Sequence, residues 1–352
     1  MRGIAALTVA LWHVTWRNHI TGLAFLRNGP LMVDFFFVLS GFVMFHSYGA
    51  KIKSLDDSRR FMIVRWGRLY PLHLAMLLVF GAIECGKWIA LRFQLAPVAS
   101  VPFAMNTPGS FLANLLLIHG LGIYAGPTWN IPSWSISTEF WTYALFAAVM
   151  LAFRNRRVFV VACATLSAAG LAVSWSAAGA LGDTGRFAFL RCILGFFAGV
   201  FTRAVYGSLA KRQLSRGVVK SGATAALLAA AAFVSVPAPG TLSFVCVPLF
   251  MVAILTAALA ENAGVRFLSA PALVWLGTVS YSIYMVHPAI VWLFEFVLQW
   301  LLHIPRPDYY ATSPLAGDLL VVLYTAIVLL VSHWTFRHIE NRFRRRIKSA
   351  VS

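Results

Sequence analysis

Charged residues are scarce in this sequence, and acidic residues are the scarcest. Only 11% of the 352 residues are charged, and 11 Asp and Glu stand against 29 Lys and Arg. A soluble domain carries about 25% charged residues. A chain that is 60% hydrophobic, with a mean hydropathy of +0.78, cannot hide its apolar side chains in a water-soluble core. The composition therefore predicts a polytopic membrane protein.

Cysteines are few, and none lies close to another: they are Cys85, Cys163, Cys192 and Cys246. This spacing excludes CxxC metal and redox motifs and gives no support to disulfides. The sequence also lacks GxSxG, P-loop, HExxH and dinucleotide-binding motifs. We therefore expect no bound metal. The first apolar run lacks the basic leader and small-residue exit of a cleavable signal peptide.

The net charge of +18 raises the question of a nucleic-acid partner. Lys and Arg fall between the apolar runs, where they act as orientation signals. No aromatic-rich soluble module accompanies them. The expected partner of this chain is a lipid bilayer, and we expect no nucleic acid.

The apolar runs predict an all-α helical bundle of about ten transmembrane helices. The patch at 111–121 is too short to cross a bilayer, so we expect it to be re-entrant or interfacial. No internal repeat, long linker or appended extracytoplasmic domain is evident, which predicts one transmembrane domain over 1–352. The expected spans are 3–20, 31–48, 71–92, 133–153, 157–177, 187–206, 219–237, 241–260, 271–300 and 316–337.

Charge sets the expected orientation. With a cytoplasmic N-terminus, most of the 29 Lys and Arg fall on the inner side, in 49–70, 154–157, 203–220 and 337–352. This bias predicts that both termini are cytoplasmic (N-in, C-in). The first span is short for a bilayer. Either its helix runs on through the polar residues 17–19, or residues upstream of Met1 have been lost.

The first apolar stretch, RGIAALTVALWH, has a cation at its start and an imidazole at its end. Arg2 and His13 are separated by about 16 Å of helix, roughly half of the hydrocarbon core. With Arg2 at one face of the membrane, His13 lies near the middle. An ionisable group at that depth is costly and indicates a functional site. The alternative is a packing histidine satisfied by a neighbouring hydroxyl or carbonyl.

Other polar residues lie within or beside the apolar runs. Ser135, Glu139 and Tyr143 share one helix face, and the carboxylate needs a partner, which His13 could supply. The alternative for Glu139 is a structural ion pair or hydrogen bond between helices. Asp34 is expected to cap the helix that starts near residue 31.

Two further groups carry potential for binding. Arg65 and Arg68 lie on one face at the inner end of the third span. They are either membrane anchors or a docking patch for an anionic ligand with phosphates, for which coenzyme A would fit. His287 shares a face with Tyr284 and precedes Pro288, so it is a structural or functional polar group.

Five sequence blocks together resemble the acyltransferase-3 family of integral membrane acyltransferases. They are RGIAALTVALWH, VDFFFVLSGFVMF, RWGRLYP, PSWSISTEFWTYALF and LVWLGTVSYSIYMVHP. The resemblance implies transfer of an acetyl group from cytosolic acetyl-CoA to a glycan hydroxyl, in the cytoplasmic (inner) membrane of a bacterial cell. The acceptor would be a cell-surface or lipid-linked saccharide, as in exopolysaccharide and lipopolysaccharide O-acetylation.

The resemblance also assigns roles to single residues. The family's Arg-x10-His motif falls on Arg2 and His13, its RxxR motif on Arg65 and Arg68, and its acidic position on Glu139. His13 and Glu139 are then the catalytic pair, with Glu139 orienting the His13 ring. His13 either deprotonates the acceptor hydroxyl or carries the acyl group transiently. The three arginines bind the acyl-CoA donor, without a metal ion.

The family's SYxxYLxH block falls on Ser280, Tyr281, Tyr284 and His287, with Met285 where Leu is usual. Two departures stand out. Family chains usually have several residues before the Arg-Gly pair, so the start looks clipped. The usual E-x-P ending is here Glu-Asn-Arg, starting at Glu340.

Other function classes remain open. One is a proton-coupled transporter or flippase of an anionic lipid-linked solute, although such proteins usually show inverted repeats. Another is a structural scaffold. Within the acyltransferase class, the donor could carry a longer acyl group, and the acceptor could be a macrolide or another small glycoside. The sequence assigns no oligomeric state.

Overall fold

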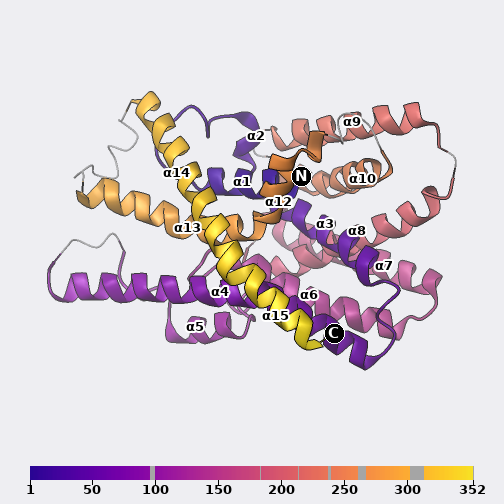
Figure 1. Ribbon diagram of the computed structural model, residues 1–352, viewed down its shortest axis with the longest axis horizontal. Coiled ribbons are helices and arrows are strands. Elements are labelled where there is room, and N and C mark those ends of the chain that lie inside the picture. The colour runs from indigo at the N-terminus through magenta and orange to yellow at the C-terminus, as the bar shows by residue number, and fades with distance from the viewer. Residues whose placement is uncertain are drawn as a thin grey trace.

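The computed structural model describes residues 1–95, 100–182, 184–212, 214–236, 239–260, 267–301 and 313–351. In this part of the chain the secondary structure is helical, without strands (Figure 1). Nine helices among the described residues are long and apolar enough to cross a membrane. The predicted all-α, multi-pass membrane bundle is therefore confirmed.

Six of the segments that can span are single helices: α3 (Leu31–Tyr48), α4 (Leu55–Arg92), α6 (Ser133–Ala152), α7 (Arg156–Ala178), α8 (Ala188–Leu209) and α9 (Arg216–Val234). The other three are α10 (Cys246–Leu259) with the turn before it, over Gly240–Leu259, α13 (Ser280–Phe296) continued to Gln299, and α14 (Pro314–Thr335) within the segment Pro314–Ala350. Shorter helices are α1 (Arg2–Trp12), α2 (Ala24–Arg27), α5 (Pro108–Leu115), α12 (Pro271–Thr278) and α15 (Asn341–Val351). As its length predicted, the apolar patch that contains α5 does not form a span.

The first helix is shorter than the predicted span 3–20. It ends at Trp12, so the expectation that it runs on through 17–19 is wrong. After the helix ends, the chain contacts the start of α14, where the Trp16 indole donates to the Gly317 carbonyl over 3.2 Å. The Asp318 carboxylate accepts the backbone N–H of His19 over 2.7 Å. The Asp318 carboxylate thereby satisfies a backbone N–H that a longer helix would pair internally.

Two other boundaries differ from the prediction. The basic segment expected before the third span is helical from Leu55 onward, and α4 runs through it without a break. The Ser54 hydroxyl begins this helix by accepting the Asp57 N–H over 3.1 Å. The predicted span 271–300 is divided at Val279 into α12 and α13.

The closest helix pair in the core is α3 and α8, and glycine makes it possible. A Cβ at Gly41 would overlap the Phe196 carbonyl oxygen, and one at Gly199 would overlap the Val38 carbonyl oxygen. Small residues let two membrane helices bring their backbones together, because packing rather than water exclusion holds them. Besides α8, α3 packs against α1 and α10, and its side chains reach those of α6 and α13 at Ser40 and Phe36.

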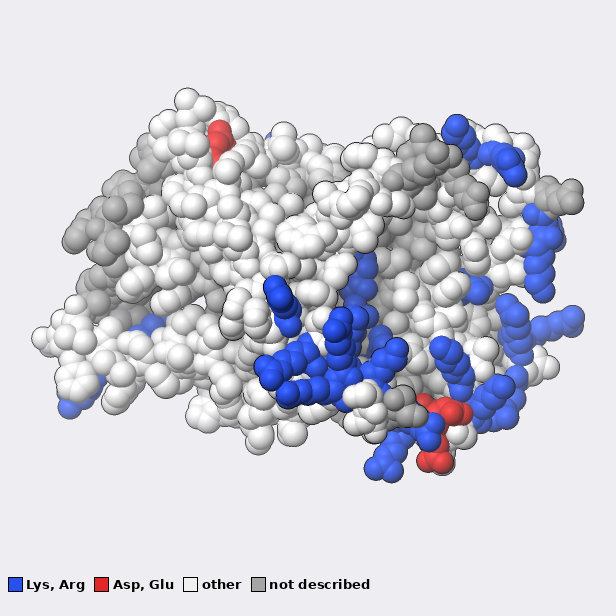
Figure 2. All heavy atoms as spheres, in the orientation of Figure 1, with Lys and Arg blue, Asp and Glu red and all other residues white. Residues whose placement is uncertain are grey.

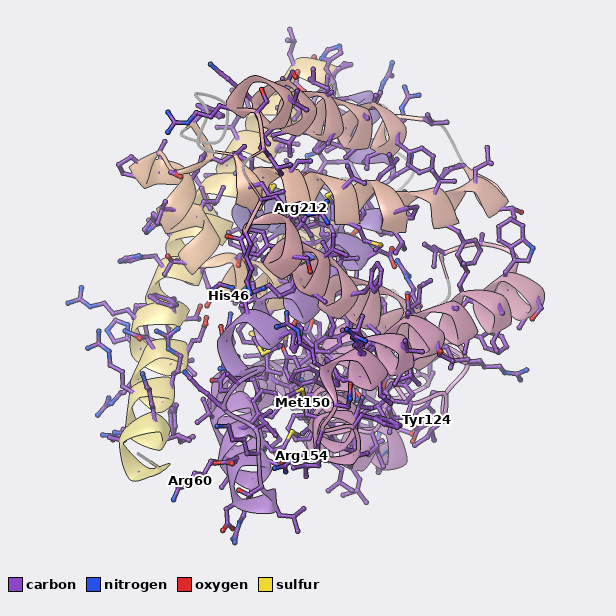
Figure 3. The ribbon with its side chains drawn as sticks, turned by 90° about the vertical axis from the view of Figure 1, so that its right-hand side faces the viewer. His46, Arg60, Tyr124, Met150, Arg154 and Arg212 are labelled. Carbon is purple, nitrogen blue, oxygen red and sulfur yellow. The ribbon has the colours of Figure 1, made fainter. Side chains whose placement is uncertain are left out.

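The basic segments share one end of the bundle, as their spacing predicted. Arg154, after α6, donates to the Lys53 carbonyl before α4 over 2.7 Å. Lys and Arg side chains gather over α15 and toward the lower right in Figure 2. Figure 3 looks onto this end, with His46, Arg154 and Arg212 labelled on it. We call it the basic end: it holds the end of α3, the start of α4 and the α6–α7 and α8–α9 connections.

Candidate active site

A pocket that is partly open to solvent lies inside the bundle, lined by residues of α1, α3, α4, α6 and α13. Its wall combines aromatic and aliphatic side chains with a few ionisable and hydroxyl groups, which is the usual make-up of a small-molecule site. The polar lining residues are Arg2, Ser40, Arg68, Ser135, Glu139, Tyr143, Ser280, Tyr281 and Tyr284.

Two arginines give the cavity a cationic region. Arg2, from the start of α1, and Arg68, from α4, both line it and lie within electrostatic range of each other. The Arg2 Nε atom is buried without a hydrogen-bond partner. Among the described residues, no hydrogen bond or close ion pair holds either guanidinium. A guanidinium group donates but cannot accept, so this region is suited to an anion.

Glu139 lies on α6 in the same wall, and Ser135 and Tyr143 accompany it on one face, as their spacing predicts. Its carboxylate accepts hydrogen bonds from the Ser40 hydroxyl at 2.5 Å and from the Tyr143 hydroxyl at 2.6 Å. It also lies within electrostatic range of Arg2. Glu139 is therefore held by α3 and its own helix. The predicted contact between Glu139 and the His13 ring is wrong.

The His13 ring is paired instead with His287. His13 Nδ1 lies 2.9 Å from the Val9 carbonyl oxygen and 3.2 Å from His287 Nε2. His287, on α13, is fully buried, and its Nδ1 lies 3.1 Å from the Ile283 carbonyl oxygen. The two ring centroids are 4.8 Å apart. This contact joins residues that are 274 positions apart in the sequence.

The two carbonyls determine where the protons of the neutral rings reside. A carbonyl oxygen only accepts, so His287 carries its proton on Nδ1 and donates it to Ile283. The His287 Nε2 atom is then an acceptor, and it faces His13 Nδ1. His13 therefore carries its own proton on Nδ1, between Val9 and His287. Its Nε2 atom keeps a free lone pair, as a general base requires.

Tyr284 connects the histidine pair to the cavity. Its side chain lines the cavity, and its hydroxyl is hydrogen-bonded to the Ser135 hydroxyl at 2.9 Å. Its ring centroid lies 6.1 Å from that of His287. The ring of Phe36, another lining residue, lies 6.1 Å from the Tyr284 ring. Neither His13 nor His287 lines the cavity, and Tyr284 is the lining residue whose ring neighbours the His287 ring.

Arg65 and Asp34 have other surroundings than the sequence predicts. Arg65 is buried outside the cavity lining, where its guanidinium donates to the Tyr48 hydroxyl over 3.0 Å. Of the predicted arginine pair, only Arg68 lines the cavity. Asp34 does not cap α3, whose N-cap is Pro30. It is instead fully buried in an ion pair with Arg191 of α8.

The sequence reasoning missed Arg191. Its Nε and Nη2 atoms donate to the two Asp34 oxygens at 2.9 and 2.7 Å, and its guanidinium lies 5.3 Å from the Trp134 ring. The sequence does contain a signal for this ion pair: Arg191 is a lone cation near the start of an apolar run, and a charge buried there requires a partner. The cation and Asp34 lie in different spans, so only their opposite charges linked them.

In the sequence, Glu340 stands out only because the family's E-x-P motif is altered there, and no role in the site is predicted for it. It is buried and accepts a hydrogen bond from the Ser282 hydroxyl over 3.1 Å. It lies within electrostatic range of Arg2 and Arg68. The cationic region of the cavity is therefore balanced by Glu139 on one side and by Glu340 beyond it.

Comparisons with known proteins relate the chain to acyltransferases. A family described as an acyltransferase domain, the acyltransferase-3 family, matches residues 1–337. Over 157 residues the chain is 33% identical to acyltransferase MdmB of Streptomyces mycarofaciens, covering 42% of this chain and 36% of MdmB. Over 145 residues it is 30% identical to protein 2 in the picA locus of Rhizobium radiobacter, covering 37% of this chain and 72% of that protein. No solved structure matches the chain.

The buried ion pair generates a stability prediction. Asp34→Asn leaves the Arg191 charge buried without a counter-charge, which costs about 3–5 kcal/mol. Replacing both partners, with Asp34→Leu and Arg191→Met, removes both charges and costs less than the single change. Unfolding of the purified protein in mixed detergent micelles measures both. The control is Asp318→Asn at the exposed pair with His19, where we expect a smaller loss; an equal loss at the two sites would contradict the prediction.

Proposed function

The chain belongs to the acyltransferase-3 family, and from this premise we propose that it is a membrane O-acyltransferase that uses acetyl-CoA. The donor supplies an acetyl or other short acyl group from the cytosol. The acceptor is a hydroxyl of a cell-surface or lipid-linked glycan. The protein would act in the cytoplasmic (inner) membrane, with the basic end facing the cytosol because positive charge is retained on that side.

The observation that carries this proposal is the hydrogen bonding of His13. A sugar hydroxyl is a poor nucleophile at neutral pH, so transfer from a thioester needs a positioned base. Val9 and His287 both engage Nδ1 of His13 and leave Nε2 as the basic atom. When Nε2 takes a proton, the charge is shared with Nδ1–H, which already has two acceptors. His287 then orients the ring and stabilises the imidazolium, the role that Glu139 was expected to have.

In the direct reaction, the acyl group passes from the thioester to the acceptor hydroxyl without an intermediate on the protein. The acceptor hydroxyl gives its proton to His13 Nε2, and its oxygen attacks the thioester carbonyl carbon. The carbon–sulfur bond breaks, and the leaving thiolate of coenzyme A takes the proton from His13. In the alternative route, Nε2 attacks the thioester carbonyl carbon, the carbon–sulfur bond breaks and the coenzyme A thiolate leaves. The acceptor oxygen then attacks the acyl carbon, the carbon–nitrogen bond breaks, and the hydroxyl proton passes to the thiolate.

The cavity supports binding of an anionic, extended donor. Arg2 and Arg68 provide guanidinium donors that have no hydrogen-bond partners among the described residues, and phosphate oxygens suit such donors. The negative charge of Glu139 partly offsets the positive charge of Arg2, although the two side chains form no close ion pair. The acyl end must pass Phe36 and Tyr284 in order to reach His13. The acceptor would approach His13 from the opposite end of the bundle.

The test is purified protein with labelled acetyl-CoA and a panel of glycans. We expect label on a glycan hydroxyl with the wild-type chain. His13→Ala should lower the rate by at least about 10²–10⁴-fold, the usual contribution of a general base. The variant should still insert and fold, as measured by membrane fractionation and size-exclusion chromatography. His338→Ala, at an exposed histidine, is the control and should keep the wild-type rate. Near wild-type transfer by His13→Ala would remove the assigned base.

His287 generates a second kinetic prediction. His287→Ala removes the acceptor that faces the His13 imidazolium, and a hydrogen bond to a charged group contributes about 1.5–3 kcal/mol. We therefore expect kcat to fall about 10- to 150-fold. KM for acetyl-CoA should stay unchanged, because His287 does not line the cavity. A rise in KM with unchanged kcat would instead indicate a role in donor binding.

A further inference from the structure

A second arginine cluster lies at the basic end, outside the cavity. A Cβ built on Gly207 of α8 would lie 3.0 Å from an Nη atom of Arg203 and 3.2 Å from an Nη atom of Arg156. Both Nη atoms therefore lie over the same glycine and close to each other. Arg203 comes from α8 and Arg156 from the first turn of α7, so the fold brings them together over a residue without a side chain.

The cluster has donors without anionic acceptors. Among the described residues, no carboxylate forms a hydrogen bond or ion pair with either arginine. Arg203 Nε donates to His46 Nδ1 over 2.9 Å, and its guanidinium lies 5.0 Å from the Tyr206 ring. These contacts hold Arg203 in place, while its outer nitrogen faces Gly207. Two adjacent cations repel each other unless an anion with several oxygens lies between them, and phosphate has the matching geometry.

The cluster stands beside the end of α3 that leads into the cavity. His46 lies in the last turn of α3, with its ring stacked on Phe42 at 6.4 Å. The same helix contributes Val43 and Met44 to the cavity wall. Figure 3 looks onto this end of the bundle, where His46 is labelled near its centre. His46, which accepts the hydrogen bond from Arg203, therefore lies within one helical turn of cavity-lining residues of α3.

We propose that Arg203 and Arg156 bind the 3′-phosphate at the nucleotide end of the acyl-CoA donor. This inference rests on the proposed function. Coenzyme A carries its reactive thioester at one end, joined by the uncharged pantetheine arm to a 5′-diphosphate and, beyond it, a nucleoside with a 3′-phosphate. Arg2 and Arg68 then bind the diphosphate at the cavity, and the Arg203–Arg156 cluster anchors the 3′-phosphate outside it. The anchoring contacts lie on α7 and α8, far from His13 in the sequence.

Direct binding tests the cluster without any need for catalysis. The probe is adenosine 3′,5′-bisphosphate, added to protein purified in neutral detergent. Arg203→Gln and Arg156→Gln should each weaken its binding about tenfold or more, since each removes a charge-assisted hydrogen bond. Arg157→Gln is the matched control: it removes an exposed cation next to Arg156 and should leave the affinity unchanged. Equal affinity in wild type and both cluster variants, or no binding by wild type, would overturn the inference.

A comparison of two donors separates this inference from the proposed function. Acetyl-pantetheine has the same thioester without phosphates or nucleotide. In Arg203→Gln, KM should rise about tenfold for acetyl-CoA and stay unchanged for acetyl-pantetheine. An equal loss with both donors would indicate a structural role and overturn the inference. Loss of the effect when phosphatidylglycerol vesicles replace detergent would assign the cluster to lipid headgroups. Wild type that binds the bisphosphate but transfers from neither donor would refute the proposed function alone.

Discussion

The hydrogen bond between His13 and His287 is the interaction on which the rest of the site depends. It joins the end of α1 to the middle of α13. A carbonyl of its own helix also holds each ring, at Nδ1 of His287 and at the same Nδ1 atom of His13 that faces His287. Within a bilayer, no bulk water is present to satisfy a polar ring, so its partners must come from the protein. The pair satisfies both imidazoles and still leaves one basic nitrogen on His13.

The early end of α1 makes this pairing possible. The chain stops being helical directly after Trp12 and docks on α14 through Trp16 and Asp318. The same short helix places Arg2 in the cavity and His13 beyond its aromatic end, about 16 Å away. Charge then follows a simple arrangement. Among the described residues, guanidinium groups without close anionic partners lie in the cavity and at the basic end, whereas the buried pair of Asp34 and Arg191 is neutralised and holds α3 to α8.

Much of the fold was predictable from the sequence, because hydropathy and charge act locally. The spans, the non-spanning patch at 111–121 and the shared end of the basic segments all follow from runs of residues. Only some members of the site were predictable: Arg2, Arg68 and Glu139 line the cavity as expected, whereas Arg65 lies outside its lining. Glu139, Ser135 and Tyr143 share a cavity wall because helical spacing determines that. The partners of Glu139, Asp34 and His13 come from other helices, and no pattern within one helix reveals which neighbour will face it.

The most direct test of this account is a structure with a hydrolysis-resistant thioether analogue of acetyl-CoA bound. The account predicts the diphosphate of the analogue beside Arg2 and Arg68, with the pantetheine arm in the cavity and the acetyl carbonyl beyond Tyr284 and within reach of His13 Nε2. It also predicts the 3′-phosphate of the nucleotide at Arg203 and Arg156. An analogue bound with its acetyl end away from His13, or outside this cavity altogether, would contradict the central claim that His13 is the base that acts on the thioester reaction.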